Sequence, residues 1–101
     1  MKMLLTVEFA HEPFNYLIRS GKAGEIIGRI LETIKPEAAY FTEQDGKRGG
    51  IFVINVQSPS EVPAFSEPFF LNFQADCKFR ILMSPEDLQK AGLGEFGKKW
   101  A

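Results

Sequence analysis

One run of six residues, Ile51-Phe52-Val53-Ile54-Asn55-Val56, constrains the fold more than any other part of the chain. Successive side chains of a strand point to opposite faces of its sheet, and both faces of this run are apolar. A strand of this kind is typical of the centre of a sheet that is covered on both sides. The rest of the chain must therefore supply neighbouring strands and cover for two sheet faces.

Three further segments have the composition and alternation of strands: residues 1–9, 38–43 and 75–83. The six-residue run itself is extended by Gly50 into a strand over residues 50–56. The pair Asp45-Gly46 stands between two of the predicted strands and favours a tight hairpin, because these residue types tolerate positive φ angles.

The first helical region is predicted over residues 11–34, opened by Pro13 and closed by Lys35-Pro36. Its apolar residues form one helical stripe from Ala23 onward, but the preceding apolar residues do not extend that stripe. Gly21 and Gly24 fall between the two sets, and each glycine costs about 1 kcal/mol inside a helix. We therefore expect a short helix, a break at these glycines and a longer packing helix.

The second helical region is predicted to begin near Ser60, which suits an N-cap. Pro68 is expected to kink or divide this helix, because proline lacks the N–H that a helix interior needs. Three phenylalanines at a spacing of four residues supply its buried face: Phe65, Phe69 and Phe73.

Residues 84–101 are predicted to form a short C-terminal helix and a tail. Ser84 and Pro85 are a strong helix start, and Gly92 is expected to end that helix. The tail is expected to be ordered only if Phe96 or Trp100 docks on another surface.

These elements predict an α+β fold of the ferredoxin-like β-α-β-β-α-β type, with a four-stranded antiparallel sheet, as a single domain over residues 1–101. In that topology the first and third strands are central. Two helices cover only one face of the sheet, so a second copy is the economical cover for the other face, and we expect a homodimer. Either face of the sheet could be the intersubunit face, and Phe52 and Ile54 lie on one of the two.

Composition excludes several classes of protein. Twelve basic and thirteen acidic residues give a net charge of −1, which argues against a nucleic-acid partner. No apolar run is long enough to span a membrane, and Met1–Phe9 carries Glu8 and resembles a strand more than a signal peptide. The single cysteine, Cys77, excludes an internal disulfide and fits a cytoplasmic location. On an apolar strand face, Cys77 is expected to be a core residue and not a nucleophile.

The element order, the Asp45-Gly46 hairpin and the segment Met83-Ser84-Pro85-Glu86-Asp87-Leu88 together resemble the dimeric α+β barrel superfamily. Within it, the chain is similar to small bacterial domains of unknown function, including the group named for a Gly-Tyr-Asp signature. Gly49-Gly50-Ile51-Phe52 stands in the region of that signature. The resemblance implies two ferredoxin-like sheets packed face to face. The superfamily includes heme-degrading and quinone-forming monooxygenases, lactone isomerases, chlorite-dismutase-like enzymes and ligand-sensing modules.

Four polar residues are candidates for a site. His11, the only histidine, is either a general acid/base or heme ligand, or an exposed residue at the start of a helix. Tyr40, Asn55 and Arg80 could line a small-molecule cleft with His11 between the helices and the sheet, or be ordinary polar residues of the surface and core. A non-heme metal site is not expected, because only carboxylates could join the single histidine.

Two classes of function follow from these observations. The first is a small-molecule-binding, interaction or regulatory module without turnover, favoured by the lack of a paired acid/base or nucleophile constellation. The alternative is a small cofactor-independent or heme-binding enzyme of the monooxygenase or isomerase kind, with His11 in its pocket.

Overall fold

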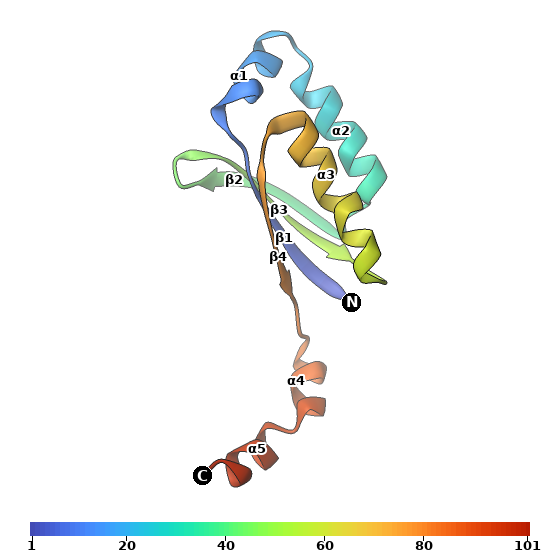
Figure 1. Cartoon of the computed structure of the whole chain (residues 1–101), viewed down its shortest axis with the longest axis vertical. Helices are drawn as coiled ribbons and strands as arrows, with labels where there is room; N and C mark the ends of the chain where they lie inside the picture. Colours follow the sequence, from blue (N-terminus) through green and yellow to red (C-terminus); the bar gives the residue numbers. More distant parts are fainter.

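A computed structural model describes all residues from 1 to 101 and places one antiparallel sheet beneath a layer of helices (Figure 1). The four strands are β1 (Lys2–Glu8), β2 (Ala38–Gln44), β3 (Lys47–Asn55) and β4 (Asp76–Ile81). The helices are α1 (His11–Arg19), α2 (Ala23–Ile34), α3 (Val62–Phe73), α4 (Pro85–Ala91) and α5 (Leu93–Lys99), with a 3-10 turn, η1 (Pro59–Glu61), before α3. None of these helices combines the length and the apolar character that a membrane crossing requires.

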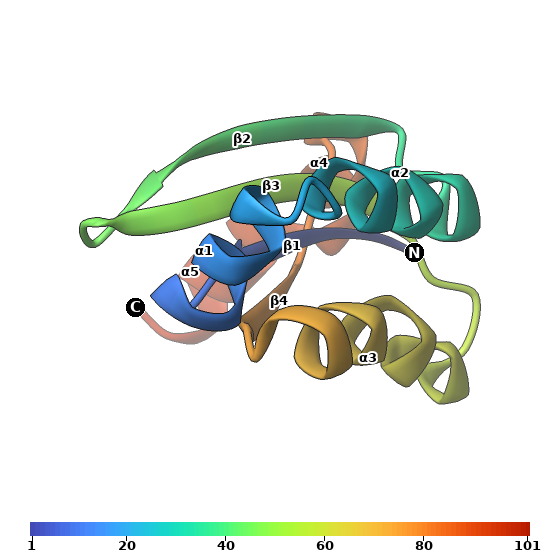
Figure 2. The ribbon, with the colours of Figure 1, turned by 90° about the horizontal axis from the view of Figure 1, so that it is seen from above.

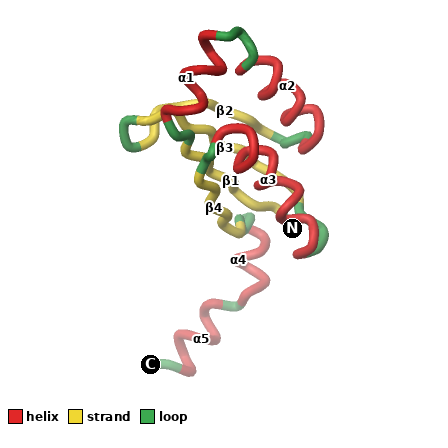
Figure 3. The backbone as a smooth tube through the Cα atoms, turned by 45° about the horizontal axis from the view of Figure 1, so that its top comes forward, coloured by secondary structure: helices red, strands yellow, loops and turns green.

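The strand order β2-β3-β1-β4 confirms that the first and third strands are central. β1 pairs with β3 on one side and with β4 on the other, and all neighbours are antiparallel. The helices α1, α2 and α3 lie on one side of this sheet (Figures 2 and 3). The chain thus has the predicted ferredoxin-like α+β fold, with its first helical region divided into α1 and α2.

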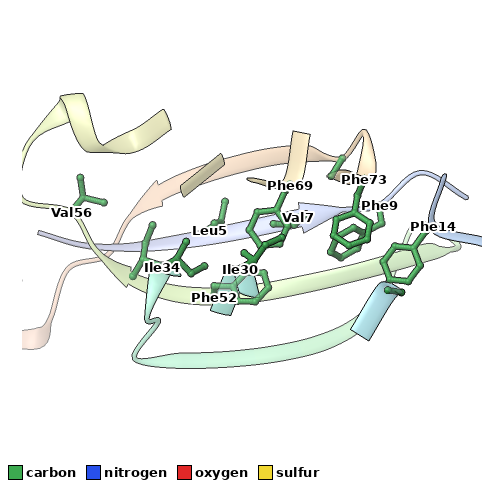
Figure 4. Packing of buried hydrophobic residues seen from close by; sticks show 13 residues of the cluster. Leu5, Val7, Phe9, Phe14, Ile30, Ile34, Phe52, Val56, Phe69 and Phe73 are labelled. Carbon is green, nitrogen blue, oxygen red and sulfur yellow. The ribbon is translucent and has the colours of Figure 1, made fainter. Parts of the chain in front are cut away.

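The core lies between this sheet and the helices (Figure 4). Leu5 and Val7 of β1 and Phe52 and Ile54 of β3 are fully buried there, because alternate residues of both strands point toward the helices. Phe52 and Ile54 are therefore covered by helices within one chain, and the face that bears them is not an intersubunit face. Their neighbours along β3, such as Val53, point to the other side of the sheet.

The predicted break between the first two helices is confirmed. α1 ends at Arg19, and Gly21 has a φ of +78°, which turns the chain before α2 begins at Ala23. The β2–β3 hairpin is confirmed as well. Asp45 and Gly46 have φ angles of +52° and +80°, the conformation that a two-residue hairpin turn requires.

The helix predicted to begin near Ser60 is present as α3, but Ser60 is not its cap and Pro68 does not divide it. Ser60 does not cap α3, because residues 59–61 form a tight turn in which the Glu61 carboxylate accepts a 2.8 Å hydrogen bond from the Gln57 N–H. The helix then starts at Val62 and continues through Pro68 to Phe73 without dividing. The loss of one backbone donor at Pro68 is tolerated because the helix is held to the core by apolar packing on both sides of it.

Beyond β4 the chain leaves the domain as two short helices (Figures 1 and 3). Ser84 caps α4 as predicted: its Oγ accepts a 3.1 Å hydrogen bond from the Asp87 N–H, and the Asp87 carboxylate accepts one of 2.9 Å from the Ser84 N–H. Gly92, with a φ of +70°, ends α4. The predicted tail is itself helical and forms α5.

The adjacent residues Phe69 and Phe70 provide a direct test of this packing. Phe69 is 1% exposed among the rings of the core, whereas Phe70 is 39% exposed on the outer side of α3. We expect Phe69→Ala to lower the free energy of unfolding by about 3–5 kcal/mol, because a large cavity is left in the core. The matched variant Phe70→Ala should lower it by less than about 1 kcal/mol. Urea denaturation followed by circular dichroism measures both, and equal losses would contradict this placement of α3.

Candidate functional site

The structure does not bring the predicted site residues into a cleft between the helices and the sheet. Tyr40, Asn55 and Arg80 alternate with residues that point to the core, so they lie on the face of the sheet that is turned away from the helices. We call this the open face. The prediction that these three residues line a cleft between the helices and the sheet is therefore wrong. It did not take into account that their side chains alternate with the core residues of each strand.

The three residues are also far from one another. Tyr40 lies on β2 and Arg80 on β4, at opposite edges of the sheet and about 14 Å apart at three strand spacings. Asn55 instead belongs to a surface cluster in which its Nδ2 donates a 2.6 Å hydrogen bond to Glu37. Lys2 Nζ lies 3.0 Å from the same carboxylate. These two partners, Asn55 first, lower the pKa of Glu37 below its ordinary value.

His11 begins α1, and its side chain is exposed to solvent. No group of three histidine, cysteine or acidic side chains converges in this chain in a way that could hold a metal ion. The structure therefore leaves His11 on the surface, away from the other polar residues that the sequence suggested.

A hollow that the sequence did not predict lies between the α1–α2 pair and the β2–β3 hairpin. Its volume is about 340 Å³. We call it the aromatic hollow, and its eight lining residues are Phe9, Phe14, Gly24, Ile27, Phe41, Thr42, Arg48 and Gly49. Five different elements or their ends contribute these residues, so the hollow exists only in the folded chain.

The helix break and one glycine shape the aromatic hollow. The chain turns at Gly21, which lets α1 supply Phe14 and α2 supply Ile27 as two separate walls. Gly24, in the first turn of α2, has no side chain, and a Cβ added there would meet no atom within 4 Å. The space beside Gly24 therefore remains open.

Arg48 gives the aromatic hollow its one charged group. Arg48 lies in β3 on the same face as Phe52 and is only partly exposed. Its Nη1 donates a 2.9 Å hydrogen bond to Asn15 Oδ1, and its guanidinium carbon lies 4.7 Å from the centre of the Phe14 ring. No carboxylate lies within ion-pair distance of it, since the ion pairs of the chain involve other residues. The guanidinium keeps further N–H donors beyond the one that Asn15 accepts. The surface of the hollow itself is almost entirely apolar, so these donors must turn toward the hollow to meet a ligand there.

Cys77 lies on the core face of β4 and is half-buried. Burial, and to a smaller extent the charge of Asp76, raises the pKa of its thiol from 9.0 to about 12. A thiol with this pKa is almost entirely protonated near neutral pH, so Cys77 is poorly suited to act as a nucleophile.

The reactivity of this thiol tests that conclusion. We expect the thiolate reagent iodoacetamide to modify Cys77 at mildly alkaline pH at least roughly a hundredfold more slowly than an exposed thiol, because a raised pKa shrinks the thiolate fraction. The rate should continue to rise with pH beyond the point where an ordinary thiol has levelled off. The matched control carries Cys77→Ala together with Ser60→Cys, which moves the single thiol to an exposed turn. Equal rates in the two folded chains would contradict the raised pKa.

Neither a protein-family model nor a curated protein matches this chain. Among solved structures, it is similar to 5-chloro-2-hydroxyhydroquinone dehydrochlorinase from Burkholderia phenoliruptrix AC1100, in its complex with 2,5-dihydroxybenzoquinone. The TM-score is 0.62 at 17% sequence identity, over 85% of this chain and 97% of that chain. The de novo designed protein Ferredog-Diesel is also similar, with a TM-score of 0.48 at 13% identity, over 80% of this chain and 85% of that one. The likeness to the dehydrochlorinase supports the α+β, ferredoxin-like fold.

Proposed function

We propose that this protein binds a small, flat molecule that carries an acidic or oxygen-rich group, and that the aromatic hollow is the site. The observation that supports this most directly is Arg48, a partly buried guanidinium without an acidic partner at the side of an otherwise apolar hollow. Placing a charge beside apolar walls is unfavourable unless the charge has a partner. An anionic ligand would supply that partner.

The dimensions and walls of the hollow define the ligand class. A volume of about 340 Å³ is near the lower end of the range for small-molecule sites, so the ligand is about one or two rings in size. Phe9, Phe14 and Phe41 offer ring faces and edges for stacking against a planar molecule. A carboxylate or an acidic ring oxygen would accept the free donors of Arg48.

Binding without turnover is the form of this function that the lining residues favour. Apart from Arg48, Thr42 is the only polar lining residue, and by the alternation along β2 its side chain points to the open face, as that of Tyr40 does. A guanidinium is not suited to act as a general base near neutral pH. His11, the residue on which an enzymatic role would depend, is not among the lining residues. The similarity to a dehydrochlorinase in complex with a dihydroxybenzoquinone is consistent with a ring-sized, oxygen-bearing ligand in this fold.

Salicylate, a single ring with a carboxylate, is a suitable probe. We expect its addition to shift the amide resonances of residues around the aromatic hollow in a ¹⁵N-labelled sample. Arg48→Gln should weaken binding by at least about tenfold, because hydrogen bonds to a charged group contribute about 1.5–3 kcal/mol. Gly24→Leu should weaken it as well by occupying the open space beside α2.

Two matched variants complete this experiment. Arg80→Gln removes a guanidinium from the open face, and Gly28→Leu adds the same side chain to α2 at an exposed position that does not line the hollow. Both should bind salicylate like the unchanged protein. Resonance shifts confined to the open face, or binding that depends on Arg80 and not on Arg48, would refute the proposed site. Urea denaturation of Arg48→Gln and Gly24→Leu verifies that both variants remain folded.

A further inference from the structure

Apart from Leu82, whose N–H donates a 3.0 Å hydrogen bond to the Lys2 carbonyl, the last twenty residues make little contact with the rest of the chain. We call residues 82–101 the C-terminal arm; it contains α4 and α5 and extends from the end of β4 away from the rest of the protein (Figures 1 and 3). Every residue from 83 to 101 except Gly92 is exposed. The arm accounts for the elongated outline of the molecule, which measures 60 × 28 × 20 Å.

The helices of the arm need a surface to pack on. Each contains seven residues, and isolated helices shorter than about 12–15 residues are marginal in water. α5 carries Leu93 and Phe96, and Trp100 follows directly at its C-cap, at a spacing that places the three on one side of a helix. All three are exposed, Trp100 to 76%. An amphipathic helix of this kind is typical of a segment that lies on an apolar surface.

The open face of the sheet has an apolar centre without cover and a charged edge along β4. Its centre is formed by Leu4 of β1 and by Ile51 and Val53 of β3, which are neighbours across the two central strands. No helix of the same chain covers this face, because α1, α2 and α3 all lie on the other side. The arm of the same chain does not cover it either, because it points away from the sheet at the end of β4 (Figure 1).

We propose that the C-terminal arm of one copy of this chain lies along the open face of a second copy, and that the arm of the second copy lies in the same way along the open face of the first. The protein is then a homodimer held by two exchanged arms. A two-fold axis makes both contacts identical, as in most homodimers. The apolar side of each arm then covers the open face of the partner's sheet.

The length of the arm matches the surface that it would cover. From Pro85 to Lys99 the two helices rise about 22 Å if they lie in line. The seven residues of β1, the central strand of the open face, span about 23 Å. An arm that enters at the β1 N-terminus of the partner therefore ends near the C-terminus of that strand.

The charges of the arm match this direction. The first turn of α4 carries Glu86 and Asp87, and it would meet the end of the open face that holds Arg80, which has no ion-pair partner. The last turn of α5 carries Lys98 and Lys99. At the far end of the open face a small hollow is lined by three carboxylates, those of Glu8, Asp45 and Asp76, and by one cation, Lys78. Lys47 Nζ lies 3.9 Å from the Glu8 carboxylate, so acidic groups are in excess there by one charge. The reverse direction would place acidic groups against acidic ones.

Trp100, the only tryptophan of the chain, reports on the arm. At micromolar concentration we expect sedimentation equilibrium to give the mass of a dimer. We also expect the fluorescence of Trp100 to be blue-shifted relative to the same protein in denaturant, since its ring is covered by the partner. Dilution into the monomer range should shift the emission to the red. A monomer at all concentrations would overturn the proposal, and so would a blue-shifted emission that does not depend on concentration, because the arm would then fold onto its own chain.

Three lysine variants separate arm exchange from direct packing of two sheets. Phe96→Lys in the arm and Ile51→Lys on the open face should each raise the dissociation constant of the dimer by at least about thirtyfold, as expected for central apolar contacts of an interface. Leu71→Lys replaces an equally apolar residue that is 80% exposed on α3, and it should leave the dimer unchanged. If Ile51→Lys dissociates the dimer and Phe96→Lys does not, the two sheets pack directly on each other and the proposal is wrong.

Discussion

The ring of Phe9 connects every layer of this protein. It follows the central strand β1 and meets Phe14 of α1 at 5.0 Å and Phe73 of α3 at 5.2 Å between ring centres, both edge to face. Phe69 of α3 contacts it at 6.0 Å and also stacks at a tilt on Phe52 of β3, at 5.3 Å. Edge-to-face pairs of this kind add about 0.5–1.5 kcal/mol each beyond the burial of their area. The positions of α1 and α3 over the sheet depend on this cluster.

The same cluster creates the aromatic hollow. Phe9 and Phe14 have one side in the core and another side on the hollow, so the residues that hold the helices in place are also the walls of the site. Gly24 leaves unfilled the space that a larger side chain would occupy. The walls of this candidate site are thus supplied by the core and by the elements packed on it.

Much of the fold was predictable from the sequence, because it is dictated by local rules. The two apolar faces of the third strand placed it in the centre of the sheet. The cost of Gly21 and Gly24 inside a helix predicted the helix break, and the positive φ angles that Asp45-Gly46 tolerates predicted the hairpin. The site was harder to predict because it depends on distant parts of the chain. Arg48 and Asn15 are 33 residues apart and meet only after β3 pairs with β1. One signal was present: Arg48 has the same alternation as Phe52 and so interrupts the core face of its strand.

The hydrogen bond between Arg48 and Asn15 also links the site to the outer surface. It joins the hairpin end of β3 to α1, a helix that otherwise exposes large apolar side chains such as Tyr16 and Ile18. A molecule that draws the guanidinium toward the hollow would pull its Nη1 away from Asn15. Occupancy of the hollow would then change how firmly α1 is held to the sheet. The exposed surface of α1 would in this way differ between the ligand-bound and the ligand-free protein.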